Sequence, residues 1–303
     1  MASKERIGFI GLGNMGAPMA RRLVDAGYEL VVTDAVPEAV ERFAAGSKCE
    51  RAASPQSIGE RCRVVITMLP NGQIVREVLL GANGLAPRLA PGSVAIDMSS
   101  SSPIGTRELS ADLATIGIAL VDAPVSGGVK KAADGMLAIM VGGEAEPVTR
   151  ARPILEAMGK VFATGPSGSG HAMKALNNFL SAANLAIAAE AVIAGQRFGL
   201  DPATMISILN ASTGRNTGTD SKFPNNVLPR TFNSGFALGL MAKDLRLALE
   251  VARSSGAPAG LLEKTAQMWA AAEQQLGGKA DNTEVVKYLE SLVPSNTEQK
   301  PNA

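Results

Sequence analysis

The sequence is poor in the residue types that mark several classes of protein. It has two cysteines, Cys49 and Cys62, and one histidine, His171. These residues are too few for a disulfide framework or a four-ligand zinc site. The low cysteine content is typical of a reducing compartment, so we expect a cytoplasmic protein. With one histidine available, we expect Lys, Asp, Glu or Tyr to transfer protons, unless His171 does so.

The chain also lacks an excess of charge of either sign. Its 29 Lys and Arg residues nearly balance 28 Asp and Glu residues, which leaves a formal net charge of +1. Such a chain has no strong field to attract nucleic acid or an anionic membrane, so we expect neither as a partner. Aromatic residues make up 4% of the chain, which argues against stacking platforms for single-stranded nucleic acid.

No apolar run has the composition of a simple membrane span. The first six residues lack the apolar core of a signal peptide. The most Ala-rich stretch, at 176–195, contains three asparagines and Glu190. These polar side chains are costly in lipid, so the stretch predicts a helix buried in protein.

The first half of the chain alternates short apolar runs with helical spacing. At 303 residues the chain is longer than one core usually supports, so we expect two domains. Strands separated by helices predict an α/β fold with a mostly parallel, doubly wound sheet. Strands are expected at 6–10, 30–33, 63–68, 93–97, 119–121 and 137–141, and helices at 15–26, 37–45, 73–80 and 103–116.

The second half of the chain reads as helices after a Gly- and Ser-rich loop at 164–170. We therefore place a domain boundary at 165, with an α/β domain over 1–165 and an all-helical domain over 166–303. Asp201 and Pro202 are expected to cap and begin one helix. The segment 212–239, rich in Gly, Asn, Pro and Thr, is expected to be a long loop. The other helices are expected at 171–198, 242–254, 261–275 and 283–292.

One glycine-rich motif points to a dinucleotide. Gly11-Leu12-Gly13-Asn14-Met15-Gly16 is a complete G-x-G-x-x-G motif between an expected strand and an expected helix. Its glycines permit a tight turn, a close approach of the pyrophosphate, and close packing of the helix on the strand. Asp34 ends the next apolar run, where a ribose-binding carboxylate is expected. Because Asp34 would repel a 2′-phosphate, the motif predicts NAD as the cofactor, with NADP less favoured. An ordinary Gly-rich turn is the alternative.

Further polar loops follow the later strands. Leu69 and Pro70 follow one strand, and the serine run 99–102 follows the next. Ligands of open α/β sheets bind at this edge, so Leu69, Pro70 and one of the serines are candidate cofactor contacts. Another serine is expected to cap the helix that begins at Pro103.

Two more motifs carry groups that could bind or transform a substrate. Ser126 precedes Gly127 and Gly128, which places a hydroxyl beside backbone N–H groups that suit a carboxylate; a plain turn is the alternative. Lys174 and Asn178 are four residues apart and share one face of an otherwise apolar helix. The alternative for Lys174 is a lysine at a helix end that extends its amine into solvent. We assign His171 to the start of the same helix.

Together these residues resemble the β-hydroxyacid dehydrogenase family, which includes 3-hydroxyisobutyrate dehydrogenase, tartronate semialdehyde reductase and L-threonate dehydrogenase. The resemblance covers nearly the whole chain. It rests on four motifs in order: the loop at 8–16, the segment 122–128, Lys174 with Asn178, and 241–245. It implies an N-terminal Rossmann domain joined by a long helix to an all-helical domain for substrate binding and oligomerisation. It also implies a homodimer or homotetramer.

The resemblance implies a reaction and a set of residues. Hydride passes between nicotinamide and a small β-hydroxy acid, and Lys174 acts as the general acid/base. The family's contacts to the substrate carboxylate fall on Ser126, Gly127, Gly128 and Asn178, and its further cofactor contacts fall on Ser100 and Lys243.

Alternative functions remain open at this point. One is a protein that holds NAD without turnover. Another is an imine reductase, whose family usually carries Asp or Tyr at the position of Lys174. Within the family, Asn216 and Thr217 stand where relatives similar to 3-hydroxyisobutyrate dehydrogenase carry a bulky aromatic residue. This difference predicts a more polar substrate pocket, unless both side chains face solvent or a neighbouring subunit.

Overall fold

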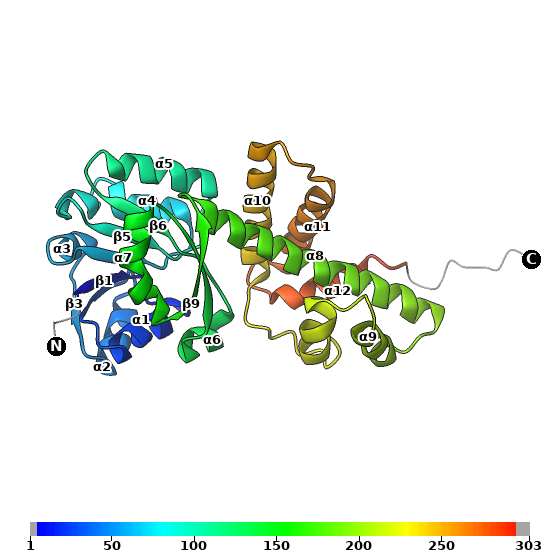
Figure 1. Ribbon diagram of the computed structural model, residues 1–303. Helices are drawn as coiled ribbons and strands as arrows, with labels where there is room; N and C mark the ends of the chain where they lie inside the picture. The colour runs from blue at the N-terminus through cyan, green and yellow to red at the C-terminus, as the bar shows by residue number, and fades with distance from the viewer. Residues whose placement is uncertain (1–4, 295–303) are drawn as a thin grey trace, which may run out of the picture. The chain divides into compact units, whose positions relative to one another are not determined.

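The computed structural model describes residues 5–294, which divide into two compact units within Met1–Ala175 and Leu176–Ala303 (Figure 1). We call them the α/β unit and the helical unit. The division falls inside helix α8, Ser169–Phe198, which is continuous across it.

The α/β unit is built on one twisted sheet. Its strands run in the order β3-β2-β1-β4-β5-β6-β8-β7, with β9 paired to β8. Every pair is parallel except β6–β8 and β7–β8, so the expected mostly parallel α/β fold is confirmed. The strands are β1 Ile7–Ile10, β2 Leu30–Thr33, β3 Cys49–Arg51, β4 Val64–Thr67, β5 Val94–Asp97, β6 Ala119–Asp122, β7 Val125–Ser126, β8 Leu137–Gly142 and β9 Gly159–Gly165.

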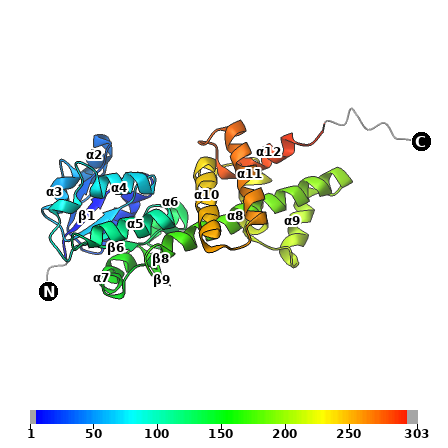
Figure 2. The same cartoon turned by 90° about the horizontal axis from the view of Figure 1, so that it is seen from above.

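Helices cover both faces of this sheet (Figures 1 and 2). The expected helices are confirmed as α1, α2, α4 and α5, and the sequence pattern missed α3, α6 and α7. Their bounds are α1 Gly16–Asp25, α2 Pro37–Ala45, α3 Pro55–Gly59, α4 Gly72–Leu80, the 3₁₀ turn η1 Ala86–Arg88, α5 Pro103–Ala114, α6 Gly128–Asp134 and α7 Ala145–Glu156.

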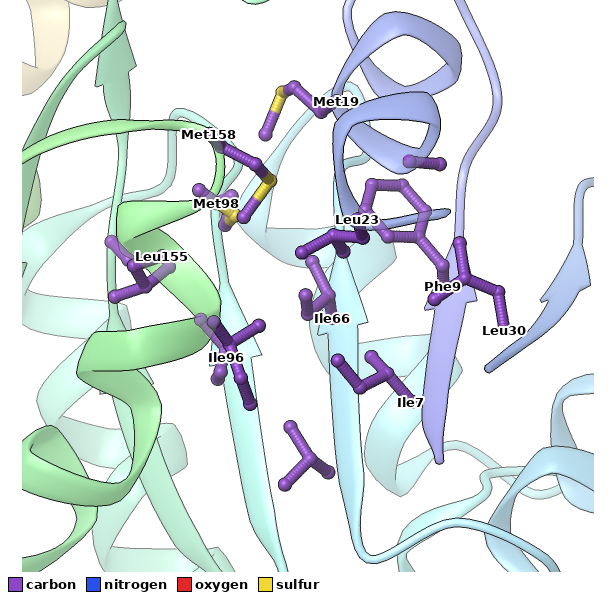
Figure 3. Close-up of a cluster of buried hydrophobic side chains, with 14 of the residues drawn as sticks. Ile7, Phe9, Met19, Leu23, Leu30, Ile66, Ile96, Met98, Leu155 and Met158 are labelled. Carbon is purple, nitrogen blue, oxygen red and sulfur yellow. The ribbon is translucent and has the colours of Figure 1, made fainter. Parts of the chain in front are cut away.

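Two apolar clusters hold the sheet between its helices. On one face, Ile7, Phe9 and Ile66 of the strands meet Met19 and Leu23 of α1 (Figure 3). A second cluster fills the other face with side chains from α3, α4 and α5. Because both faces are buried, β1, β2, β4 and β5 are apolar at nearly every position, as expected for parallel strands in such a sheet.

The helical unit contains the rest of α8 and the elements that follow it. Asp201 caps α9 by accepting from Thr204 N at 2.8 Å, as expected. The expected long loop at 212–239 is wrong in part, because it contains a π-helix, η2. The remaining elements are α9 Pro202–Ala211, η2 Gly218–Val227, α10 Leu238–Ser255, α11 Gly260–Leu276, the 3₁₀ turn η3 Asn282–Glu284 and α12 Val285–Ser291.

Helix α8 is, by length and composition, apolar enough to cross a membrane. However, 44% of its most apolar window is buried inside the protein. A core helix of a globular protein passes the same test, and α8 also carries the polar residues noted above.

Candidate active site

The glycine-rich loop joins β1 to α1 at the carboxyl edge of the sheet. Gly11 has a φ of +99°, and a Cβ there would overlap the Met68 carbonyl oxygen. A Cβ at Gly16 would overlap the Gly11 carbonyl oxygen. These contacts allow glycine alone at both positions, because the turn is tight and the helix packs directly against it.

Asp34 lies at the end of the neighbouring strand β2 and faces this loop. Its Oδ2 accepts from Leu12 N at 2.6 Å, and its Oδ1 accepts from Val36 N at 2.8 Å. The predicted ribose-binding carboxylate therefore holds the glycine-rich loop in place, a role the sequence did not reveal. Its contact with a ribose stays a prediction.

The loops after β4 and β5 are tied to each other at the same edge. Leu69 N donates to Ser99 Oγ at 2.9 Å. Ser102 Oγ accepts from Gly105 N at 3.1 Å, which identifies Ser102 as the expected cap of α5. Since β2, β1, β4 and β5 are parallel neighbours, their loops bring Asp34, Leu69, Pro70 and Ser100 to one edge with the six-residue glycine-rich motif.

The predicted carboxylate-binding loop lies further along this edge. Ser126 ends β7 and is half-buried, while Gly127 and Gly128 are exposed. The two glycines have φ values of +139° and +73°, which other residues rarely adopt. A side chain at Gly127 would also press on the Lys131 side chain. The loop thus keeps a hydroxyl and accessible backbone N–H groups together, which suits an anionic group.

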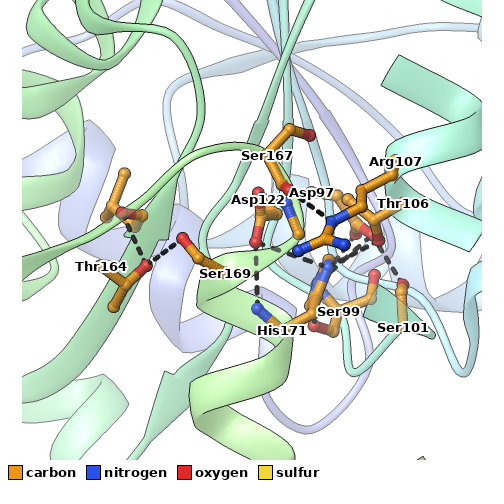
Figure 4. Close-up of polar contacts among 12 residues, drawn as sticks. Asp97, Ser99, Ser101, Thr106, Arg107, Asp122, Thr164, Ser167, Ser169 and His171 are labelled. Carbon is orange, nitrogen blue, oxygen red and sulfur yellow. Dashed lines mark hydrogen bonds and ion pairs between the residues drawn. The ribbon is translucent and has the colours of Figure 1, made fainter. Parts of the chain in front are cut away.

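The start of α8 is held to the end of β6 by a buried carboxylate (Figure 4). Asp122 Oδ1 accepts from Gly168 N at 2.8 Å, and Asp122 Oδ2 accepts from His171 N at 3.0 Å. A carboxylate at a helix N-terminus satisfies free N–H groups and opposes the helix dipole. His171 lies in the first turn of α8, as expected, but its burial and the role of Asp122 were not predicted.

Lys174 and Asn178 lie one turn apart on α8. Lys174 has 8% and Asn178 has 6% of its surface exposed. A lysine whose amine reaches into solvent would be more exposed, so the burial of Lys174 argues against that alternative. A buried amine in the α/β unit, at the helix start anchored by Asp122, is a suitable group for proton transfer.

Within the helical unit, Asn178 is oriented by a residue that the sequence reasoning missed. Its Nδ2 donates to Asp244 Oδ2 at 2.5 Å, and its Oδ1 accepts from Asn177 Nδ2 at 3.2 Å. Asp244 is 1% exposed on α10, beside Lys243, whose Nζ lies 3.8 Å from Asp244 Oδ1. The available signal was Asp244 itself, a carboxylate on the otherwise apolar face of α10, next to the predicted cofactor contact.

The surroundings of Asn216 and Thr217 favour the alternative in which these side chains do not line a substrate pocket. Asn216 Oδ1 accepts from Gly218 N at 2.8 Å and from Thr219 N at 3.2 Å, and its Nδ2 donates to Gly214 O at 3.0 Å. Thr217 is exposed. The Asn216 amide is engaged inside its own turn at the start of η2, which argues against a role in substrate binding.

The described residues give little support to two other chemistries, a thiol nucleophile and a bound metal ion. Burial raises the pKa of the Cys62 thiol to about 11, so this sulfur stays protonated and is a poor nucleophile. Within residues 5–294, no group of three or more His, Cys, Asp or Glu side chains is arranged to hold a metal ion.

Two family models together match most of the chain. Residues 6–165 match the NAD binding domain of 6-phosphogluconate dehydrogenase, and residues 168–289 match the model described as NAD-binding of NADP-dependent 3-hydroxyisobutyrate dehydrogenase.

Individual relatives extend this similarity over the whole fold. The chain is 38% identical over 301 residues to mitochondrial 3-hydroxyisobutyrate dehydrogenase of Mus musculus, covering 97% of this chain and 90% of that protein. It is 42% identical over 259 residues to NAD-dependent L-serine dehydrogenase of Pseudomonas aeruginosa, covering 83% and 86%. The structure of Mycobacterium tuberculosis 3-hydroxyisobutyrate dehydrogenase with L-serine aligns with a TM-score of 0.85 at 36% identity, covering 94% and 99%. An imine reductase from Myxococcus stipitatus, at 17% identity and a TM-score of 0.63, shares the fold alone.

Proposed function

The chain belongs to the β-hydroxyacid dehydrogenase family, and on this premise we propose that it transfers a hydride between NAD and a small β-hydroxy acid, with Lys174 as the general acid/base. The observation that carries the proposal is the burial of Lys174 near the start of a helix that Asp122 anchors to the cofactor edge of the sheet. With the one histidine of the chain assigned to the start of α8, Lys174 is the best candidate for the proton carrier.

The chain's residues fit the cofactor and the substrate. Gly11 and Gly16 form a turn that a Cβ would fill, and the Asp34 carboxylate is placed to accept from a ribose hydroxyl. When bound, NAD supplies the hydride acceptor. The Ser126 loop binds the substrate carboxylate, and Lys174 Nζ takes the hydroxyl proton during oxidation and returns it during reduction.

A substrate panel tests this function. NADH formation is measured with L-serine, 3-hydroxyisobutyrate, and C4 to C6 hydroxy and sugar acids. L-serine is itself a β-hydroxy acid, and two of the relatives are named for it or hold it. We expect turnover with at least one β-hydroxy acid. NAD binding without turnover of any panel member or of cyclic imines would favour a binding protein.

We predict a preference for NAD that depends on Asp34. Asp34→Asn keeps one acceptor for the glycine-rich loop and removes the charge that repels a 2′-phosphate, so it is a milder test than Asp34→Arg. The ratio of kcat/KM with NAD to that with NADP is expected to fall about tenfold, equivalent to ~1.4 kcal/mol. Asp25→Asn, at an exposed position on α1, is the matched control. An unmodified enzyme that prefers NADP would contradict the role of Asp34.

We also predict that Asn178 positions the substrate. Asn178→Ala is expected to raise KM and lower kcat, reducing kcat/KM by roughly 10- to 100-fold. Asn178→Asp should be worse, because it sets a second carboxylate against the buried Asp244 in place of a donor. Steady-state kinetics on both variants decide this, and unchanged constants in Asn178→Ala would remove the residue from the site.

The quaternary state and the compartment are further parts of the proposal. A homodimer or homotetramer is supported by exposed apolar side chains in the helical unit, namely Leu180, Ile187, Phe198 and Leu261. A reducing compartment such as the cytoplasm is supported by Cys49 and Cys62, which are both free thiols. Light scattering measures the oligomeric state directly.

A further inference from the structure

His171 is a fully buried polar side chain to which the proposed reaction gives no role. Its side chain has 0% of its surface exposed. It lies in a polar cluster formed by the end of β5, the start of α5, the end of β6 and the first turn of α8 (Figure 4). A buried polar cluster of this kind is costly unless its groups are paired, so its hydrogen bonds define what it does.

Both ring nitrogens of His171 have partners on other elements. Nε2 lies 3.1 Å from the Ser99 carbonyl oxygen, which can only accept, so Nε2 carries a hydrogen and donates. Nδ1 lies at hydrogen-bonding distance, 2.8 Å, from Thr106 Oγ1. The Thr106 hydroxyl in turn donates to the Ser102 carbonyl oxygen at 2.9 Å, so the imidazole is linked to the cap region of α5.

The two buried carboxylates beside the imidazole bind the segments that it joins. Asp97 lies 3.6 Å from Nε2 and accepts from Ser99 N at 3.0 Å and Ser101 Oγ at 2.7 Å, which fixes the serine run. Asp122 lies 3.9 Å from Nδ1 and fixes the start of α8 through its backbone N–H groups. His171 is a side chain of α8 that connects these two anchored segments.

The connection reaches the residues of the proposed reaction on both sides. Ser99 Oγ also accepts from Leu69 N, and Ser99 is adjacent to Ser100, a predicted cofactor contact. On the other side, Lys174 follows His171 by three residues and therefore lies about one helical turn further along α8. The start of α8 packs closely against the sheet, because a Cβ at Gly170 would overlap the Met140 carbonyl oxygen.

We propose that His171 is a positioning residue, which fixes the first turn of α8 against the serine run and so sets the place of Lys174 relative to the cofactor loops. This inference rests on the function proposed above. Without the imidazole, α8 keeps its backbone bond to Asp122 but loses the link from Nε2 to the Ser99 carbonyl oxygen. A displacement of the acid/base group by about 1 Å can cost roughly 100-fold in rate.

Two substitutions at His171 distinguish a role in positioning Lys174 from a role in the stability of the fold alone. His171→Leu removes both ring contacts, whereas His171→Gln can return an amide donor to the Ser99 carbonyl. Rates are expressed per NAD-binding site, found by titration, so that unfolded protein does not count. His171→Leu is expected to lower kcat by roughly 10- to 100-fold, with KM and the Kd of NAD within about threefold of the unmodified enzyme. His171→Gln is expected to recover most of the loss.

An isotope effect and a control complete the test. With substrate deuterated at the carbinol carbon, His171→Leu should show a kinetic isotope effect on kcat at least as large as that of the unmodified enzyme, because the chemical step is slowed. Ser93→Ala is the matched control: Ser93 is 0% exposed and donates to Ala90 O, but it lies at the opposite end of β5. We expect it to retain kcat.

Several outcomes would overturn the proposal. They are a kcat per site in His171→Leu within threefold of the unmodified enzyme, a smaller isotope effect, or a His171→Gln variant as impaired as His171→Leu. If His171→Leu does not fold, Thr106→Val removes only the hydroxyl that faces Nδ1; a three- to tenfold loss of kcat supports the proposal, and no loss overturns it. Failure of the proposed function appears separately, as an inactive unmodified enzyme.

Discussion

Lys174→Ala is expected to lose kcat by roughly 100- to 10,000-fold, the usual contribution of one general acid/base group. The substitution removes a buried amine near the start of α8 and leaves the glycine-rich loop and Asp34 untouched. NAD affinity and the cooperative unfolding transition should therefore stay close to those of the unmodified protein. Steady-state kinetics and calorimetric titration of NAD measure the two quantities independently.

Lys174→Arg separates proton transfer from charge. Arginine keeps the positive charge but does not release its proton in the working pH range, so this variant is expected to be nearly as inactive as Lys174→Ala. Lys160→Ala, at an exposed position on β9, is the control and should keep full activity. If Lys174→Arg kept more than a tenth of kcat, the role of Lys174 would be electrostatic, and another group would have to carry the proton.

The loops at the carboxyl edge of the sheet could be predicted from the sequence because their signals are local. The apolar runs of β1, β2, β4 and β5 reflect burial on both faces of the sheet, and glycine is required at Gly11 and Gly16 by contacts within the loop itself or with the neighbouring strand end. In a parallel sheet, strand ends meet at one edge, so the loops that follow them assemble there without further information. Short or exposed elements were missed: β7 has two residues, and β9 alternates half-buried with exposed positions.

The polar contacts behind the site could not be read from the sequence. His171 meets Thr106 and Ser99, which precede it by 65 and 72 residues, and Asn178 meets Asp244, which follows it by 66 residues. Each of these side chains also has a sufficient local explanation. His171 lies near a helix start, Ser99 and Thr106 lie near a helix cap, and Asp244 lies beside a lysine. Only the packing of distant segments shows which buried polar groups face each other.

The segment around η2 shows a different limit. Asn216 is a candidate for pocket lining because it stands where relatives carry a bulky aromatic residue, but its amide satisfies backbone groups two and three residues away. Asn side chains compete in this way for local backbone donors wherever a turn allows it. Composition at 212–239 favours a loop, and no propensity scale distinguishes a loop from the π-helix that forms there.

Gly16→Ala is expected to damage both folding and cofactor binding. The new Cβ would overlap the Gly11 carbonyl oxygen and approach the Phe9 ring to 3.4 Å, so α1 must move away from β1. Overpacking of this kind lowers the free energy of unfolding by about 1–3 kcal/mol. The same movement shifts the N–H groups at the start of α1, which are expected to face the pyrophosphate. We therefore expect NAD affinity to fall on the order of 100-fold.

Gly13→Ala should separate these two effects. Gly13 is exposed, and a Cβ there meets no protein atom within 4 Å. The free energy of unfolding is therefore expected to change by less than about 0.5 kcal/mol, as for ordinary surface substitutions. If the backbone at Gly13 is where the pyrophosphate approaches, the added methyl group must still weaken NAD binding by about tenfold or more. Chemical denaturation and NAD titration of both variants give the comparison. Tight NAD binding by Gly13→Ala would mean that the dinucleotide lies elsewhere on this edge, because the protein itself gives no reason for glycine at that position.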